Sequence, residues 1–475
     1  MNILGLSAIT IAKLIRDREL SALAVMMQTL EQAERVQRAL NPFVTIAWDQ
    51  AIEHAKRCDE LLLKGPPSNT AHLFGVPFTA KDLLNTFDLR TTYGSRAFEA
   101  FQPKADVVAI DRLRKAGAVL IGKTTTPEFA SKLLTDSELT GITRNPWVPA
   151  RSPGGSSGGA AAAVASGVGA FAVSTDGGGS ARVPAAACGI LGLKVTLGAI
   201  PHETWPFHFG NNSSISINSR NVEDLILAFN LMKGANSMDP WSRRQIEPLT
   251  QPAQSQTKGL KKNALLIPAL GGQACDKKIM AIVGQSIQAL ERNGYEITIA
   301  EGDPIAFDSS LSFDMMAANL AARVRAMQPD ERARLSAPLK TLLSNMTFKS
   351  DGVCLQAQAI ERSALYDRLE QSLSRYSLLL TPTLNAQPPL ADPSGDQRVR
   401  INDDWAPLAA WWSHLSIANL TGHPAISIPC GWDADGLPVG LHAIAGWDCE
   451  QDLVDLAANA ALNHDWTSHL PSFES

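Results

Sequence analysis

Hydrophobic and polar positions follow a helical rhythm at the start of this chain. Within residues 7–64, apolar side chains such as Met26 and Leu30 recur at the spacing that places them on one helix face. Ser7 and Ser21 precede two of the apolar runs, where a serine can cap a helix N-terminus. The pattern therefore predicts a group of N-terminal helices.

A second pattern, short apolar runs between helical segments, predicts the strands of a buried sheet. Residues 106–116 have a helical periodicity that Gly117 ends, and the apolar run 118–121 follows directly. Residues 378–380 and 425–429 are similar runs. Helices that alternate with buried strands indicate an α/β protein whose sheet is mostly covered.

Three further segments complete the pattern. Residues 74–78 form a short apolar run just before Lys81. Residues 202–375 are polar and helical in pattern, and they contain no recognisable motif. Residues 448–462 close the chain with an amphipathic helix.

Composition limits the partners of the protein. The 475 residues are 45% hydrophobic and 19% charged, a balance typical of soluble globular proteins, and the formal charge is −5. Lysine and arginine are spread along the chain, so no nucleic-acid partner is expected. Because no apolar run could cross a bilayer and no signal peptide is recognisable, we expect a cytoplasmic protein without a membrane partner. The cysteines lack CxxC spacing, so we expect reduced thiols and no metal site.

Residues with chemical potential are concentrated in a glycine- and serine-rich centre. Two loops carry them, Gly154-Gly155-Ser156-Ser157-Gly158-Gly159 and Thr175-Asp176-Gly177-Gly178-Gly179-Ser180-Ala181-Arg182. Consecutive glycines let several backbone N–H groups converge on one point, as a developing oxyanion or a phosphate requires. Ser180, which follows three glycines, therefore has the setting of a nucleophile beside its oxyanion hole.

Three other interpretations compete with this one. The glycines could simply form tight turns that allow close packing. Residues 117–124 match the phosphate-loop pattern GxxxxGK[ST], but their variable positions are Ala-Val-Leu-Ile, a strand preceded by a helix, which disfavours ATP binding. Residues 154–158 match the GxSxG elbow of α/β-hydrolases, which would need a downstream histidine such as His442 or His464.

Motifs around the two loops carry a family resemblance. They are Gly75-Val76-Pro77-Phe78-Thr79-Ala80-Lys81-Asp82, Arg144-Asn145-Pro146-Trp147, Cys188-Gly189-Ile190-Leu191-Gly192-Leu193-Lys194, Asn419-Leu420-Thr421-Gly422-His423-Pro424-Ala425-Ile426-Ser427-Ile428-Pro429 and Gly436-Leu437-Pro438-Val439-Gly440. In order and spacing they closely resemble the amidase signature family over residues 5–465, with a weak stretch at 205–375.

The resemblance implies a single α/β domain over residues 1–475, built on a large mixed twisted sheet that helices wrap. Its expected parts are N-terminal helices at 1–65, the signature core at 66–200, a variable helical substrate-side region at 201–375, and the C-terminal part of the core at 376–475.

The resemblance also implies a catalytic triad. It places the base at Lys81, a bridging serine with a cis peptide bond at Ser156, and the nucleophile at Ser180. A lysine can act as a base when burial lowers its pKa from about 10.4, and the apolar neighbours of Lys81 favour this. The Ser156 hydroxyl can pass the proton because it both donates and accepts. We expect hydrolysis of a carboxamide through an acyl-enzyme on Ser180, without a cofactor.

Residues around the triad are expected to support it. The expected oxyanion donors are the backbone N–H groups of Gly177, Gly178, Gly179 and Ser180. Asp176 and Arg182 are interpreted as a pair that holds the glycine loop. Ser157 and Thr175 are expected to add hydrogen bonds.

The substrate pocket is predicted less directly. Its candidates are Tyr93, Phe129, Trp205, Met315, Met316, Trp411 and Trp412. The adjacent Trp411 and Trp412 could wall an acyl pocket, and an equally open interpretation makes them core residues. Thr125 stands where the family usually has asparagine, which changes the contacts expected beside the site.

Two alternatives to a stand-alone amidase stay open. One is the glutaminase-type subunit of a tRNA-dependent amidotransferase, which works in a complex. That protein carries an acidic residue before its NLxG motif, whereas residues 411–414 here are Trp-Trp-Ser-His, and its Tyr-Asp-Gly motif is missing. The other is an inactive binding protein of the same fold, against which the complete triad argues. The expected partner is a small-molecule amide, and a homodimer is an open option for the assembly.

Overall fold

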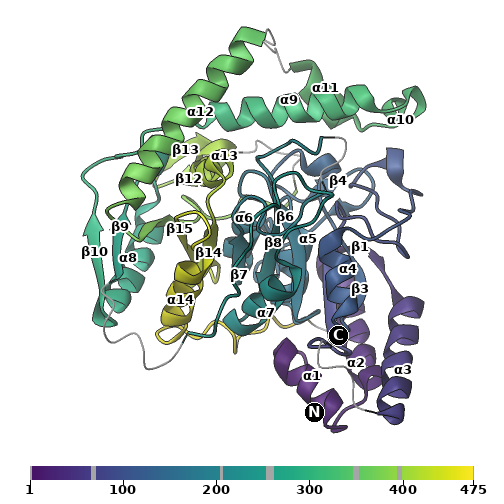
Figure 1. The fold of residues 1–475 in the computed structure, drawn as a ribbon. Helices are drawn as coiled ribbons and strands as arrows, with labels where there is room; N and C mark the ends of the chain where they lie inside the picture. The colour runs from purple at the N-terminus through teal and green to yellow at the C-terminus, as the bar shows by residue number, and fades with distance from the viewer. Residues whose placement is uncertain are drawn as a thin grey trace.

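The central sheet draws strands from almost the whole chain. The computed structural model describes residues 3–65, 71–203, 207–252, 262–345, 352–392 and 398–473. One 11-stranded mixed sheet has the order β1-β3-β2-β6-β8-β7-β14-β15-β11-β9-β10, and helices flank it (Figure 1). The strands are β1 Phe43–Ile46, β2 Pro77–Lys81, β3 Val119–Thr124, β6 Phe171–Asp176, β7 Leu191–Lys194, β8 Ser214–Ser219, β9 Lys262–Leu266, β10 Tyr295–Ile299, β11 Leu378–Pro382, β14 Ala425–Trp432 and β15 Pro438–Ala445.

The N-terminal helices confirm the prediction from periodicity. They are α1 (Ala8–Arg16), α2 (Ala22–Leu40) and α3 (Trp48–Lys64). Ser7 and Ser21 cap the first two, because each side-chain oxygen accepts a hydrogen bond from a backbone N–H of the first turn. The sequence interpretation missed β1, a four-residue strand antiparallel to β3 at the edge of the sheet.

The two chemically interesting loops lie at one edge of the sheet. β2 and β6 are parallel neighbours, with Ala80 paired to Val173, and they end at Lys81 and Asp176. Carboxyl ends of parallel strands meet at the same edge, so Lys81 and the second glycine loop are brought together. The first loop leads into helix α5 (Gly158–Ala165), which is buried along its whole length.

Other predicted elements are present with shifted bounds. Helix α4 (Val108–Lys115) and strand β3 correspond to the predicted helix and strand around Gly117. The predicted strands at 378–380 and 425–429 lie within β11 and β14, and the closing helix is α14 (Glu450–Ala461). The remaining helices of the core are α6 (Arg182–Cys188), α7 (Val222–Met232), α8 (Lys277–Arg292) and α13 (Ile417–Thr421).

The helical interpretation of residues 202–375 was wrong for three segments. β8, β9 and β10 lie in this range and belong to the central sheet. β8 is entirely buried although it reads Ser-Ile-Ser-Ile-Asn-Ser, and its backbone pairs with β6 and β7. Its serines and asparagine lowered the apparent hydrophobicity, while antiparallel pairing on both sides stabilises the strand.

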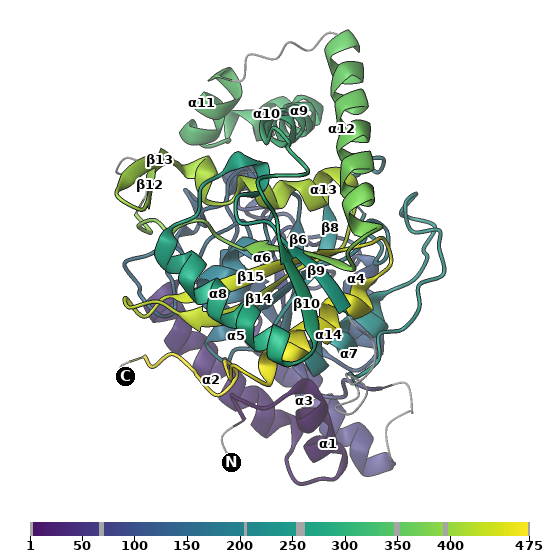
Figure 2. The ribbon, with the colours of Figure 1, turned by 90° about the vertical axis from the view of Figure 1, so that its left-hand side faces the viewer.

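A group of helices beyond the sheet forms the cap, which we define as α9 (Ser310–Ala326), α10 (Pro329–Ala333), α11 (Ala337–Asn345) and α12 (Gly352–Leu373). Figures 1 and 2 show the cap at the top of the molecule, on the side opposite to α1, α2 and α3. α12 packs on α13 and β11, which anchors the cap to the C-terminal part of the sheet.

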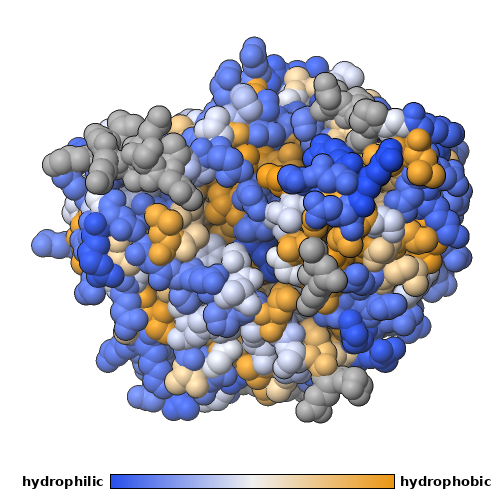
Figure 3. Space-filling model, turned by 90° about the horizontal axis from the view of Figure 1, so that it is seen from below, coloured by the Kyte–Doolittle hydropathy of each residue, from blue (hydrophilic) through white to orange (hydrophobic). Residues whose placement is uncertain are grey.

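The surface has a mixed character. On the face seen from below in Figure 3, apolar side chains form patches between hydrophilic ones. In the part of the chain that the structure describes, no helix is long and apolar enough to span a membrane. Each of the six cysteines is a free thiol.

Candidate active site

Lys81 is the buried base candidate at the carboxyl end of β2. Its Nζ donates a hydrogen bond to Oγ of Ser156 at 2.7 Å and another to Oγ1 of Thr175 at 3.1 Å. Lys81 and Ser156 are both wholly buried. Burial lowers the pKa of Lys81 to about 7, and the negative charge of Asp176 opposes this shift. A substantial neutral fraction of the amine is therefore available near neutral pH.

The two serine-bearing loops contact each other. The Ser157 N–H donates to the carbonyl oxygen of Ser180 at 3.2 Å, and Oγ of Ser157 donates to the carbonyl of Thr175 at 3.3 Å. The peptide bond between Gly155 and Ser156 is cis. Ser180 retains 5% exposure, whereas Ser156 has none. The predicted nucleophile is therefore the more accessible of the two serines.

Asp176 and Arg182 form a buried ion pair that closes the glycine loop. Arg182 donates to both carboxylate oxygens, at 2.9 Å from Nε and 3.0 Å from Nη2. The same carboxylate accepts the N–H groups of Gly179 at 2.6 Å and Ala181 at 3.1 Å. Burial alone would raise the pKa of Asp176, but Arg182 and these N–H groups hold it below its usual range. An ionised Asp176 thus fixes the backbone that leads to Ser180.

Two residues from distant segments complete this network, although neither was expected to contact Asp176 or Arg182. Asn419 of α13 donates to Oδ1 of Asp176 at 3.0 Å and accepts from Nη2 of Arg182 at 2.7 Å. His442 of β15 lies 3.0 Å from Nη1 of Arg182. Asn419 begins one of the sequence motifs, which was the available signal. The GxSxG interpretation requires a histidine beside the serine, whereas His442 contacts Arg182. The other histidine candidate, His464, lies beside the Trp466 ring.

The glycines of the second loop differ in their surroundings. The N–H of Gly179, one of the four expected oxyanion donors, instead donates to Oδ1 of Asp176. A Cβ at Gly178 would lie 3.1 Å from Sδ of Met316 and 3.9 Å from the ring of Trp412. A Cβ at Gly177 would lie 3.7 Å from Cβ of Ser213. Met316, Trp412 and Ser213 therefore surround the outer part of the loop.

The structure separates the aromatic pocket candidates. Trp411 is wholly buried, and its Nε1 donates to the carbonyl of Ala386, so it packs in the core. Trp412 lies beside the glycine loop. Tyr93 and Phe129 stack in a separate aromatic cluster, with ring centroids 6.4 Å apart.

The two methionine candidates for the pocket differ in their surroundings. Met315 packs against the core near α12, whereas Met316 faces the glycine loop. Trp205 lies outside the described residues.

Residues 117–124, which match the phosphate-loop pattern, have a structural role. Lys123 lies within β3, and its Nζ donates to the carbonyl of Leu84 and to Oγ1 of Thr91, both at 2.6 Å. Thr125 Oγ1 lies 2.7 Å from Oγ1 of Thr143, so this threonine contacts a neighbouring loop. Among the described residues, no group of three histidine, cysteine or acidic side chains could hold a metal ion.

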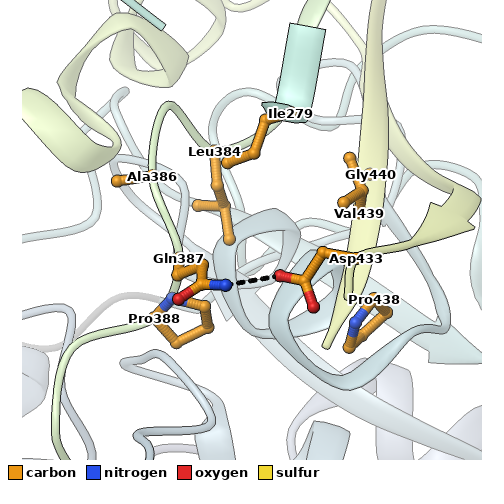
Figure 4. A pocket seen from close by; sticks show the side chains of 9 residues that line it. All are labelled: Ile279, Leu384, Ala386, Gln387, Pro388, Asp433, Pro438, Val439 and Gly440. Atoms are coloured by element: carbon orange, nitrogen blue, oxygen red, sulfur yellow. Dashed lines mark hydrogen bonds between the residues drawn. The ribbon is translucent and has the colours of Figure 1, made fainter. Parts of the chain in front are cut away.

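A depression elsewhere on the molecule contains none of the predicted site residues (Figure 4). It is lined by Ile279, Leu384, Ala386, Gln387, Pro388, Asp433, Pro438, Val439 and Gly440. Gln387 donates to Asp433 at 2.8 Å across it. These two polar groups satisfy each other, and the depression is not part of the candidate site.

Comparison with known proteins identifies the class. The amidase family model matches residues 24–454. The chain is 30% identical to an acylamidase of Rhodococcus erythropolis, over 99% of this chain and 98% of the relative. It is 32% identical to a glutamyl-tRNA(Gln) amidotransferase subunit of Prochlorococcus marinus strain MIT 9313, over 95% and 97%. The crystal structure of a bacterial aryl acylamidase superposes with a TM-score of 0.87 at 26% identity, covering 97% of each chain.

These matches define an amide hydrolase with an α/β fold. The chain belongs to the amidase signature family. The resemblance seen in the sequence motifs is confirmed, as is the expected fold, a large mixed sheet flanked by helices.

Proposed function

We propose that this chain is a stand-alone amidase that hydrolyses a carboxamide to a carboxylate and ammonia or an amine. Ser180 is the nucleophile, Ser156 the proton relay and Lys81 the base. The observation that carries the proposal is the hydrogen bond of 2.7 Å between Nζ of Lys81 and Oγ of Ser156, inside a wholly buried site. A neutral lysine in that position can remove a serine proton, which an ordinary surface lysine cannot do near pH 7.

The acylation step follows from these positions. Oγ of Ser180 attacks the amide carbonyl carbon, and its proton passes to Ser156, which gives its own proton to Lys81. Backbone N–H groups of Gly177, Gly178 and Ser180 stabilise the oxyanion, while the Gly179 N–H holds Asp176. The proton returns from Lys81 through Ser156 to the leaving nitrogen, and the C–N bond breaks.

The deacylation step uses the same relay. Water attacks the ester on Ser180, and Lys81 takes the proton of that water through Ser156. The proton returns from Lys81 through Ser156 to Oγ of Ser180 as the ester C–O bond breaks. The carboxylic acid leaves and loses its remaining proton to solvent, which gives the carboxylate. Each group therefore returns to its starting state without a cofactor.

One observation favours a stand-alone enzyme over a member of an amidotransferase complex. Trp412 contacts the glycine loop, and the run 411–414 offers no carboxylate that could bind the amino group of glutamine. The acylamidase relative, which matches over 99% of this chain, provides a precedent for an acyl amide as substrate. We also propose that the enzyme is cytoplasmic and that residues 1–475 form one domain. The cap lies in the substrate-side region of this domain.

Three variants test the mechanism. Ser180→Ala, Ser156→Ala and Lys81→Ala should each lower kcat on simple acyl amides by a factor on the order of 10³ or more. Ser374→Ala, a change at an exposed serine, should keep parental turnover. Unchanged turnover in Ser180→Ala would refute the assigned nucleophile.

Two further measurements separate the alternatives. A fluorophosphonate probe should label the parent and not Ser180→Ala, whereas an inactive binding protein would stay unlabelled. The purified chain alone should hydrolyse acyl amides. Activity confined to glutamine in the presence of partner proteins would instead assign it to the amidotransferase class.

A further inference from the structure

Arg362 of helix α12 joins the cap to two segments of the core. Its Nη1 donates to Oδ1 of Asn211 at 2.7 Å, and its Nη2 donates to the carbonyl oxygen of the same residue at 3.3 Å. Its Nε donates to the carbonyl oxygen of Leu420 in the last turn of α13, which packs beside α12 (Figure 2). One half-buried guanidinium therefore holds the segment before β8 and the end of α13 together.

Both of these core segments lead directly to the glycine loop. Nδ2 of Asn419 in α13 lies 2.9 Å from the carbonyl oxygen of Asp176 and 3.0 Å from its Oδ1. The same nitrogen lies 3.1 Å from the carbonyl oxygen of Asn212, in the segment before β8. Ser213 follows in the chain, and a Cβ at Gly177 would lie 3.7 Å from Cβ of Ser213. The two segments are thus bonded to each other and contact the loop from two sides.

The chemistry of arginine suits this position. The oxygens that accept its hydrogen bonds are neutral, and one of them is a carbonyl at the C-terminal end of a helix, where the helix itself supplies no donor. A guanidinium can serve acceptors on two different segments because its five donors lie in one rigid plane. Lysine at this position would reach fewer of them.

The same helix carries a matched contact that leads elsewhere. Arg368, six residues later and also half-buried, donates from Nε to the carbonyl oxygen of Ile305 at 2.7 Å. Its Nη2 donates to the carbonyl oxygen of Ala306 at 3.3 Å. Ile305 and Ala306 precede α9, so Arg368 anchors α12 to that segment, whereas Arg362 anchors it to α13.

Another contact holds α12 in place independently of Arg362. Oε1 of Glu370 lies 2.8 Å from Nε2 of His423, which follows α13 in the chain. Loss of the Arg362 guanidinium therefore releases Asn211 and the end of α13 while the cap stays attached to the core. A substitution at this position is expected to fold.

We propose that Arg362 is a positioning residue for the amidase reaction. Its contacts keep Asn419 against Asp176, whose carboxylate holds the backbone of the glycine loop. That loop ends at Ser180, so a small displacement of α13 would move the nucleophile and the oxyanion donors out of their reactive geometry. The inference rests on the proposed amidase function and adds a residue of the cap to it.

Arg362→Gln tests the proposal, with Arg368→Gln as the matched control. Arg362→Gln should lower kcat on simple acyl amides by about 10–100-fold, with KM within about twofold of the parental value. The rate constant for labelling of Ser180 by the fluorophosphonate probe should fall by a similar factor. Arg362→Lys should regain part of both rates. Arg368→Gln should keep both parental rates although it also removes an anchor of α12.

The outcomes decide the role of Arg362. Parental kcat and labelling in Arg362→Gln would overturn it, and so would an equal loss in Arg368→Gln, because the effect would then be a general one of anchoring the cap. If Arg362→Gln does not fold, Asn211→Ala removes a single acceptor and decides instead. Slower labelling of Asn211→Ala than of the parent supports the role, and parental labelling overturns it.

The same measurements separate this inference from the proposed function. If the probe labels the parent at Ser180 and labelling does not depend on Arg362, the amidase function stands and only the positioning role fails. If the probe does not label the parent and no amide is cleaved, the function itself fails.

Discussion

The side-chain nitrogen of Lys81 lies 2.7 Å from Oγ of Ser156, and neither side chain reaches solvent. The lysine comes from β2 and the serine from the loop before α5, so the contact forms only when the sheet is assembled. Asp176 lies near enough to act on Lys81 by its charge, but its carboxylate is held by Arg182. Burial is therefore the dominant influence on the pKa of Lys81.

The first prediction concerns pH. Because burial lowers the pKa of Lys81 to about 7, the neutral base is the minor form below pH 7 and the major form above it. We expect kcat/KM to rise about tenfold per pH unit up to about pH 7 and then to level off. A profile of amide hydrolysis from about pH 5 to 9 measures this, and a flat profile would contradict a neutral lysine base.

The second prediction concerns the ion pair beneath the glycine loop. Asp176→Asn leaves the buried Arg182 charge without its partner, so we expect about 3–5 kcal/mol of destabilisation and a large loss of kcat. Thermal unfolding and amide hydrolysis measure the two effects. Asp403→Asn breaks a solvent-exposed pair with Arg400 and should change stability by less than about 1 kcal/mol. Equal effects of the two changes would argue against the assigned role.

The third prediction compares two glycines in helices. A Cβ at Gly159 of α5 would lie 2.3 Å from Oγ1 of Thr125 and 2.5 Å from the carbonyl of Pro42, so Gly159→Ala should lower the unfolding temperature strongly. Gly284 of α8 has open space around its Cβ position, and Gly284→Ala should stabilise the helix by about 0.5–1 kcal/mol. Differential scanning fluorimetry of both variants distinguishes steric crowding from a general effect of alanine.

The fourth prediction concerns Lys123. Its Nζ is bound by Leu84 and Thr91 and lies 3.5 Å from the buried Asp82, so Lys123→Met should destabilise the protein by about 3–5 kcal/mol. Lys115→Met, at an exposed position, should have little effect. ATP should leave the unfolding temperature of the parent unchanged. A rise with ATP would revive the phosphate-loop interpretation.

Sequence motifs were sufficient to predict the family and the identities of the triad candidates. Lys81, Ser156 and Ser180 each lie in a short motif that can be recognised from consecutive residues alone. The first two N-terminal helices could also be predicted from sequence, because Ser7 and Ser21 each cap the helix that directly follows them. These features depend on neighbours in sequence.

The rest of the site depends on contacts between distant segments. Met316 meets Gly178 from a helix far along the chain, and Asn419 reaches Asp176 from near its end. Strand β8 was missed for a related reason, because its polar residues are tolerated only through pairing with β6 and β7. No local periodicity encodes such pairings.

The position of α9 has a consequence for how this enzyme can diversify. The strands and loops of the sheet carry the proposed catalytic groups, whereas one helix of the cap places Met316 beside Gly178 and Phe313 against Trp412. Substitutions on a single helix could therefore exchange one amide preference for another while the inherited chemistry stays intact. Laboratory evolution that randomises only the positions of α9 beside the glycine loop would explore new substrates without altering the sheet.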